Sequence, residues 1–270
     1  MLLRLSQTLL IGALAATIVG SPALAARPTG GGTAYLLGND VSYPQCNKTL
    51  PSGQAFGIVG VNDGLANTTN PCLSAELAWA QGSTGATAQP KAQLYVNTAN
   101  PGGLNTLSWP SSNVDPSGNL AANPYGDCDH SNSLACAWQY GWNRAVEDAT
   151  NRGVTDPSTY AWWLDVETGN SWDTTTGGQA RNVADLEGMI AEFEAIGTTA
   201  GIYSTTAQWQ SIVGTVSPTS NLNGLNNWRP GARNHSGAQS NCSLTPLTSG
   251  GKVTITQYVS GTLDYDVSCL

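Results

Sequence analysis

Short apolar runs alternate with amphipathic stretches along most of the chain. The apolar runs have the length and composition of β-strands, and they cover residues 36–41, 56–61, 93–97, 160–166, 199–203, 226–229 and 253–258. Between them, apolar residues recur at helical spacing in residues 71–81, 135–152, 183–196 and 207–212. Gly153 and Gly197 directly follow two of these stretches, which is typical of helix C-termini.

This alternation predicts an α/β protein with a parallel sheet, because each helix returns the chain to the same end of the sheet. Roughly eight strands over residues 34–270 fit a single closed, TIM-like β/α barrel. We expect the barrel to be irregular, since helices become scarce in its last third. A doubly wound open sheet is the alternative fold. No GxGxxG motif follows a strand and there is no P-loop, so nucleotide binding is not expected.

The first residues have the pattern of an export signal. Arg4 precedes a short apolar stretch, and Ala23-Leu24-Ala25 is a small-x-small cleavage site. We expect residues 1–26 to be a signal peptide cleaved near Ala25, and residues 27–33 to be a flexible lead-in. Since no later stretch approaches ~18 apolar residues, we expect a secreted protein without a membrane-inserted segment. A monomer is expected.

The composition is polar and acidic. The formal net charge is −8, which argues against nucleic acid or an anionic membrane surface as a partner. Nine Trp residues occur on this polar chain, and carbohydrate-binding surfaces often use such rings. Trp172, which follows a predicted strand, is a candidate for stacking on a sugar.

All six cysteines follow the expected signal peptide. An even number of cysteines in an exported chain favours three disulfides over metal ligands, although about 15 pairings are possible. We favour sequential pairing: Cys46–Cys72, Cys128–Cys136 and Cys242–Cys269. The sequence has no CxxC pair and only two His, so no metal site is expected.

Residues 100–133 form a long, polar, Pro- and Gly-rich segment without a predicted strand or helix. Loops of this length usually carry function or cover a site.

Two carboxylates, Asp165 and Glu167, lie at the end of an apolar strand. Residues i and i+2 of a strand point to one face, ~7 Å apart, so both acids should face the C-terminal mouth of the barrel, where barrel enzymes place catalytic groups. Their like charges, and burial beside Trp162 and Trp163, should raise at least one pKa. A protonated carboxyl can donate to a glycosidic oxygen while its ionised neighbour stabilises positive charge on the sugar. Taken alone, the pair could also be a solvated strand end.

Further acids occur at both ends of the chain. Asp40 ends the first apolar run, and Asp264 and Asp266 follow the last one. The first and last strands of a closed barrel are neighbours, so these acids can converge with Asp165 and Glu167 on one mouth. Asp266 and other polar and aromatic residues at strand ends are candidate substrate-binding residues: Asn97, Tyr203, Gln257 and Tyr258.

Five motifs occur in the same order as in a known family: Asp40-Val41-Ser42, Leu164-Asp165-Val166-Glu167, Gly201-Ile202-Tyr203-Ser204, Gln257-Tyr258 and Leu263-Asp264. Together they resemble the family 25 glycoside hydrolases, which are secreted lysozyme-type muramidases, and their glycoside hydrolase-like relatives. The resemblance implies a barrel of five β/α units and three further strands. The six cysteines and the long segment 100–133 depart from the family pattern.

The resemblance also implies residue roles. Glu167 matches the general acid, and Asp165 matches the carboxylate that orients the substrate's 2-acetamido group as an internal nucleophile. Asp40 and Asp264 match acids that line the catalytic centre, and Tyr203 matches a sugar-contacting tyrosine.

We therefore expect a secreted glycosidase, without a cofactor, that cleaves a cell-envelope polysaccharide, with peptidoglycan as the expected substrate. Two alternatives remain open. One is a glycosidase acting on an envelope or plant glycan without acetamido groups, and the other is a non-catalytic glycan-binding protein with the same barrel.

Overall fold

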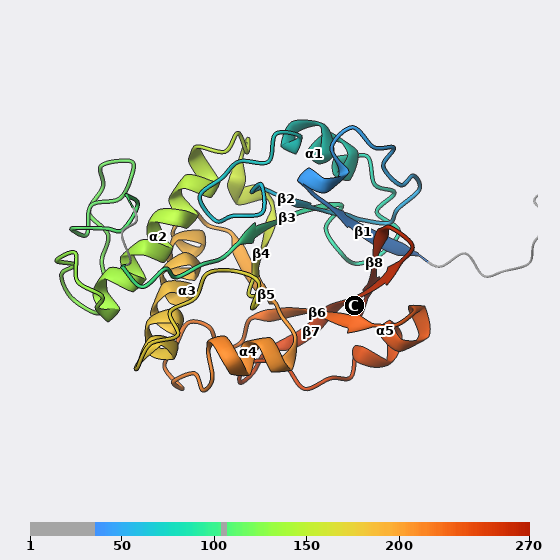
Figure 1. Cartoon of the computed structure of the whole chain (residues 1–270). Helices are drawn as coiled ribbons and strands as arrows, with labels where there is room; N and C mark the ends of the chain where they lie inside the picture. Colours follow the sequence, from blue (N-terminus) through green and yellow to red (C-terminus); the bar gives the residue numbers. More distant parts are fainter. Residues whose placement is uncertain (1–35, 104–106) are drawn as a thin grey trace, which may run out of the picture. The chain divides into compact units, whose positions relative to one another are not determined.

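The computed structural model describes residues 36–103 and 107–270 and contains a closed barrel of eight strands (Figure 1). The strands are β1 (Leu37–Val41), β2 (Gly57–Gly60), β3 (Ala92–Asn97), β4 (Ala161–Asp165), β5 (Thr199–Tyr203), β6 (Asn226–Ala232), β7 (Lys252–Ser260) and β8 (Leu263–Ser268). The predicted single α/β barrel is confirmed, and the open sheet is wrong. The expected signal peptide and lead-in, residues 1–26 and 27–33, lie outside the described residues.

The direction of the last strand differs from that of the others. Strands β1 to β7 pair in parallel, whereas β8 is antiparallel to both β7 and β1. The sequence predicted residues 253–258 as the last strand and placed Asp264 and Asp266 beyond it. That prediction is wrong, because both acids lie on β8, the second strand of a hairpin with β7. Because Asp264 and Asp266 alternate with other residues, β8 lacks the apolar run by which the other strands were predicted.

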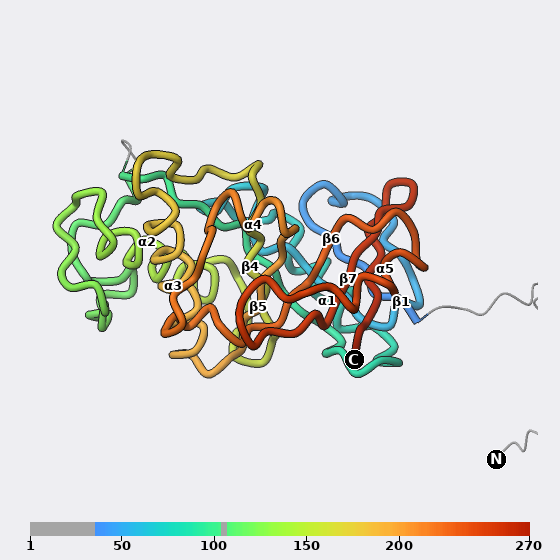
Figure 2. Tube along the Cα trace, turned by 90° about the horizontal axis from the view of Figure 1, so that it is seen from below, coloured from blue at the N-terminus to red at the C-terminus, as the bar shows by residue number. Residues whose placement is uncertain are grey.

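The described residues also form five α-helices: α1 (Leu73–Gln81), α2 (Leu134–Thr150), α3 (Gly178–Ala195), α4 (Thr206–Ile212) and α5 (His235–Asn241). Two short 3₁₀ helices, η1 (Tyr43–Gln45) and η2 (Pro157–Thr159), complete the described secondary structure. The sequence pattern predicted α1 to α4 but missed α5, a short polar helix. Helices α2 and α3 lie side by side (Figure 1, Figure 2). Their backbones approach so closely that a Cβ at Gly141 would lie 1.8 Å from the Asp185 carbonyl oxygen.

The described residues form four hydrophobic clusters, of which two surround and fill the barrel. The largest cluster lies between the strands and the helices, where Trp162 stacks on Phe193 of α3 with ring centroids 4.7 Å apart. Another cluster fills the barrel and includes Phe56, Trp163 and Trp228. Because side chains alternate along a strand, Trp162 points outward while Trp163 and Asp165 point inward. The barrel is thus closed by aromatic rings below its mouth.

Three disulfides join Cys46 to Cys72, Cys128 to Cys136 and Cys242 to Cys269. The sequential pairing predicted from the sequence is therefore confirmed. Among the described residues, no helix is both long and apolar enough to cross a lipid bilayer.

Candidate active site

Carboxyl groups from three strands line one cleft at the mouth of the barrel. The cleft has a volume of about 300 Å³, and its lining includes Asp40, Asp165, Glu167 and Asp264, together with Asn97. Asp40 and Asp165 come from the carboxyl ends of parallel strands, which meet at one edge of a barrel. Asp264 reaches the same edge because β8 is antiparallel, so its first residues lie there. The four acids named from the sequence thus share a single cleft.

Asp165 is the most constrained acid of the cleft. Its Oδ2 accepts a hydrogen bond from Asn97 Nδ2 at 2.9 Å, while its buried Oδ1 has no partner among the described residues. Burial raises the pKa of Asp165 well above its ordinary value, and the nearby Glu167 raises it further. The sequence attributed a raised pKa to the like charges of the two acids and, in addition, to burial beside Trp162 and Trp163. That attribution is wrong for Trp162, which points away from the mouth, into the outer core.

Glu167 is half-buried and lies just beyond the end of β4. Its Oε1 accepts a hydrogen bond from Gln208 Nε2 at 3.3 Å. Its backbone carbonyl accepts one from Trp172 Nε1 at 2.8 Å. Gln208 belongs to α4, whose N-terminus is fixed by a capping box with Thr205. Glu167 therefore keeps one side open to the cleft while its backbone is held in place.

Asp40 is held by a chain of polar side chains inside the barrel. Gln257 Nε2 donates to Asp40 Oδ2 at 2.8 Å, and Tyr203 Oη donates to Gln257 Oε1 at 2.9 Å. Burial raises the pKa of Asp40 to about 7, and the charge of Asp264 adds to the shift. Tyr203 and Gln257, which the sequence proposed as substrate contacts, therefore support an acid of the cleft.

Asp266 lies beneath Asp40 and is fully buried. Its Oδ1 accepts a hydrogen bond from Trp228 Nε1 at 2.9 Å. Burial, and then the charge of Asp40, raise the pKa of Asp266 well above its ordinary value. A single negative charge on the Asp40–Asp266 pair is more stable than two like charges in contact, so the pair is expected to share one proton. Asp266 is thus inaccessible to a substrate, contrary to the sequence-based prediction.

Two other predicted substrate contacts lie outside the cleft. Tyr258 packs on the outer face of the barrel, where it stacks on Tyr265 with ring centroids 5.3 Å apart. Adjacent residues of a strand point to opposite faces, so Gln257 and Tyr258 could not both face the mouth. Trp172 lines a larger neighbouring cavity of about 1030 Å³. Asn170 lines both this cavity and the cleft, so Trp172 lies beside the acids and not among them.

Sequence reasoning missed Tyr95 and Ser42, which also line the cleft. Tyr95 lies two residues before Asn97 on β3, so the same alternation that selected Asn97 could have identified it. Gly60 on β2 makes room for both, because a Cβ there would lie 2.4 Å from Ser42 Oγ and 2.6 Å from Tyr95 Cζ. Gln208 carries no comparable signal, because it comes from a helix rather than a strand.

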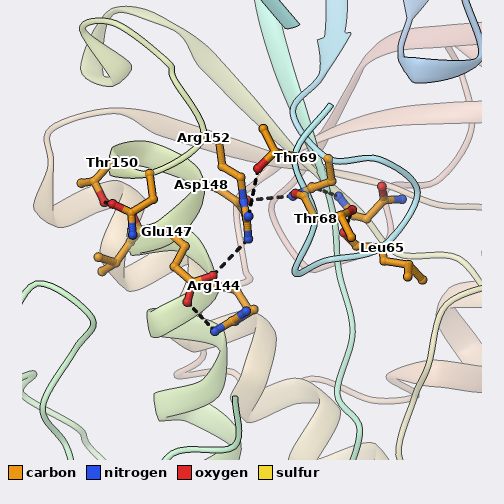
Figure 3. A network of polar contacts seen from close by, with 12 residues as sticks. Leu65, Thr68, Thr69, Arg144, Glu147, Asp148, Thr150 and Arg152 are labelled. Atoms are coloured by element: carbon orange, nitrogen blue, oxygen red, sulfur yellow. Dashed lines mark hydrogen bonds and ion pairs between the residues drawn. The ribbon is translucent and has the colours of Figure 1, made fainter. Parts of the chain in front are cut away.

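A buried polar network surrounds Asp148 and Arg152 of the α2 region (Figure 3), and hydrogen bonds of Asn62 extend it to the cleft. Asp148 of α2 is fully buried, and its Oδ1 accepts from Arg152 Nε at 3.3 Å and from Asn62 Nδ2 at 2.9 Å. Asn62 Oδ1 in turn accepts from the backbone N–H of Asn97 at 2.8 Å. Since the Asn97 side chain holds Asp165, the network fixes the backbone from which that contact is made.

Replacing Asn62 by Leu should lower the free energy of unfolding by about 2–4 kcal/mol, because it removes the acceptor of the Asn97 N–H and one of the two donors to the buried Asp148 Oδ1. Chemical denaturation followed by Trp fluorescence measures the change. Asn67→Leu, an exposed position in the same loop, is the matched control and should stay within about 0.5 kcal/mol of wild type. Equal stability of the two variants would contradict the proposed role of Asn62.

Metal ligation has no support among the described residues. The one group of candidate ligands with suitable geometry there is Cys46, Cys72 and Glu76. Its two cysteines form a disulfide and are not available as thiolates.

Comparison with known proteins shows which known fold the chain shares. A family model described as lysozyme-like protein 1 matches residues 140–240, which include Asp165, Glu167 and Tyr203. The bacterial lysozyme from Streptomyces coelicolor superposes with a TM-score of 0.52 at 17% identity, over 88% of this chain and 93% of that one. The chain has the fold of a bacterial lysozyme.

Two fungal enzymes give weaker superpositions. The muramidase from Acremonium alcalophilum gives a TM-score of 0.49 at 16% identity, over 86% of this chain and 93% of that one. A family GH25 lysozyme from Aspergillus fumigatus gives 0.49 at 15% identity over the same shares. No curated protein sequence matches the chain. The resemblance found in the sequence is thus confirmed for the fold and for the lysozyme-like match of residues 140–240.

Proposed function

We propose that the protein is a secreted glycosidase that cleaves peptidoglycan. The observation that carries this proposal is the cleft in which Asp40, Asp165, Glu167 and Asp264 meet. The lysozyme-like match and the lysozyme fold support the choice of a glycan over other substrates. The expected signal peptide, residues 1–26, supports export.

In the proposed reaction, Glu167 donates a proton to the oxygen of the leaving sugar. It is suited to this role because it is partly open to the cleft and carries one weak, long hydrogen bond from Gln208. As the glycosidic bond breaks, positive charge develops on the sugar ring. The reaction uses carboxyl groups of the chain and needs no metal or organic cofactor.

Asp165 stabilises this positive charge or orients a 2-acetamido group that attacks the ring carbon. Its fixed hydrogen bond with Asn97 and its burial make it a positioned acceptor rather than a mobile one. Asp40 and Asp264 hold the sugar or the attacking water and set the charge of the cleft. Their own burial favours a neutral or shared-proton state, which limits repulsion among four acids in one cleft.

The proposal predicts that the purified protein releases new reducing ends from peptidoglycan. A panel of envelope and plant glycans without acetamido groups is assayed in parallel. Turnover of these glycans alone would favour the other glycosidase. Binding of a glycan without turnover of any substrate would contradict the enzyme and favour a glycan-binding protein on this barrel.

A further inference from the structure

The described part of the long loop that the sequence singled out does not line the proposed active site. None of residues 107–133 lines the cleft that holds the four acids. The loop lies on the outer side of α2, away from the strands (Figure 1, Figure 2). The length of this loop is therefore not explained by a role as a lid over Asp165 and Glu167.

The described part of this loop is tightly fixed, although it has no helix or strand. The Cys128–Cys136 disulfide ties it to α2. Trp109 stacks on Tyr140 of α2 with ring centroids 5.3 Å apart, and Asn123 Nδ2 donates to the Ala135 carbonyl at 2.7 Å. These contacts hold the loop in one conformation on the α2 surface.

The loop forms one wall of a pocket with a volume of about 580 Å³, which we call the outer pocket. Helices α2 and α3 and the segment 217–221 form the other walls. Its lining includes Pro124, Tyr125, Trp138, Glu187, Ala191 and Asn221. The volume lies in the range of small-ligand sites, about 300–1,000 Å³. It shares no lining residue with the catalytic cleft.

An aromatic ring is held in a fixed orientation at the edge of the outer pocket. Tyr125 is 39% exposed, yet its hydroxyl donates to Glu187 Oε2 on α3. Asn221 Nδ2 donates to the Glu187 carbonyl oxygen at 3.0 Å. This hydrogen bond attaches the segment 217–221, the third wall of the outer pocket, to the residue that also holds Tyr125. An exposed ring that is already immobilised loses little conformational entropy when a ligand packs on it.

We propose that the outer pocket binds a segment of a glycan strand, as a second carbohydrate site separate from the catalytic cleft. The choice of a glycan rests on the proposed function. The Tyr125 ring offers an apolar face for the C–H groups of a sugar, and the Glu187 carboxylate accepts hydrogen bonds from its hydroxyls. Ser217, Thr219 and Ser220 add hydroxyl groups along the third wall. A second site on one chain increases the effective concentration of a polymeric substrate at the cleft.

The test compares a polymer with a short substrate. Binding to insoluble peptidoglycan is measured in a Glu167→Gln background, which prevents turnover, and hydrolysis of a soluble N-acetylglucosamine oligomer is measured with Glu167 intact. Tyr125→Ala should weaken binding to the polymer about three- to tenfold and leave hydrolysis of the short oligomer unchanged. Glu187→Gln should weaken polymer binding in the same direction.

Two further variants distinguish a loss of glycan binding from misfolding of the loop. Ala122→Trp introduces a bulky side chain at the lining of the outer pocket without removing a hydrogen bond, and it should weaken polymer binding as Tyr125→Ala does. Leu120→Ala truncates a 78% exposed side chain of the same loop outside the pocket lining and serves as the control.

Polymer binding unchanged in both Tyr125→Ala and Ala122→Trp would overturn the proposal, as would a Glu167→Gln protein that does not bind the polymer at all. A parallel loss of binding and of short-oligomer hydrolysis would also overturn it. If no substrate is turned over but polymer binding still depends on Tyr125, the second site stands and the proposed catalytic function fails.

Discussion

Replacing Glu167 by Gln should lower the proposed hydrolysis of peptidoglycan at least about 100-fold, the smallest usual contribution of a general acid. The substitution keeps the size of the side chain and an acceptor for Gln208, so the cleft keeps its shape while the proton to be donated is lost. Release of reducing ends measures the rate, and circular dichroism checks that the variant is folded.

Glu194→Gln is the matched control, since it makes the same chemical change at an exposed position of α3. Its activity should equal that of the wild type. A Glu167→Gln protein with more than about a tenth of wild-type activity would remove Glu167 from the role of general acid, and Asp40, Asp165 and Asp264 would then be tested by the same amide substitutions.

The protein should be more stable at pH 5 than at pH 8. Burial raises the pKa values of several carboxyl groups to about 7, namely those of Asp40, Asp148 and Glu192. It also raises the pKa values of Asp165, Asp185 and Asp266. Between about pH 4 and pH 7, the folded protein therefore binds more protons than the unfolded chain does. The free energy of unfolding then decreases as the pH rises through this window.

Several groups act in the same direction, so the loss between pH 5 and pH 8 should reach a few kcal/mol, or roughly 5–10 °C in Tm. Thermal unfolding followed at both pH values measures it. Asp148→Asn removes one of these groups while keeping an acceptor for Asn62, so its Tm should depend less on pH. A wild-type Tm that is higher at pH 8 than at pH 5 would contradict the assignment of raised pKa values to these carboxyls.

Much of the barrel could be predicted because its strands obey simple rules. β4 is an apolar run between two helical stretches, and β5 follows a Gly that ends α3, so both have clear signals in the sequence. β8 could not be recognised in this way. Its inward positions carry Asp264 and Asp266 instead of apolar residues, because Asp264 lines the polar mouth and Asp266 accepts a hydrogen bond from Trp228 inside the barrel.

The same rules limit what could be predicted of the site. Strand ends identified the four acids and Asn97, which do line one cleft. They could not separate Gln257, which faces inward, from its neighbour Tyr258, because that distinction depends on the register of β7 against β8. Nor could they identify Gln208 or Asn62, whose side chains reach the site from a helix and a loop.

The position of β8 at the end of the barrel sequence also determines at which stage of folding the cleft can form. Asp40 and Asp264 come from opposite ends of the barrel sequence, and Asn39 Nδ2 donates to the Asp264 carbonyl across 225 residues of chain. Contacts over such separations form late and slowly in folding. A growing chain therefore has no complete set of acids until its last hairpin has emerged and closed the ring.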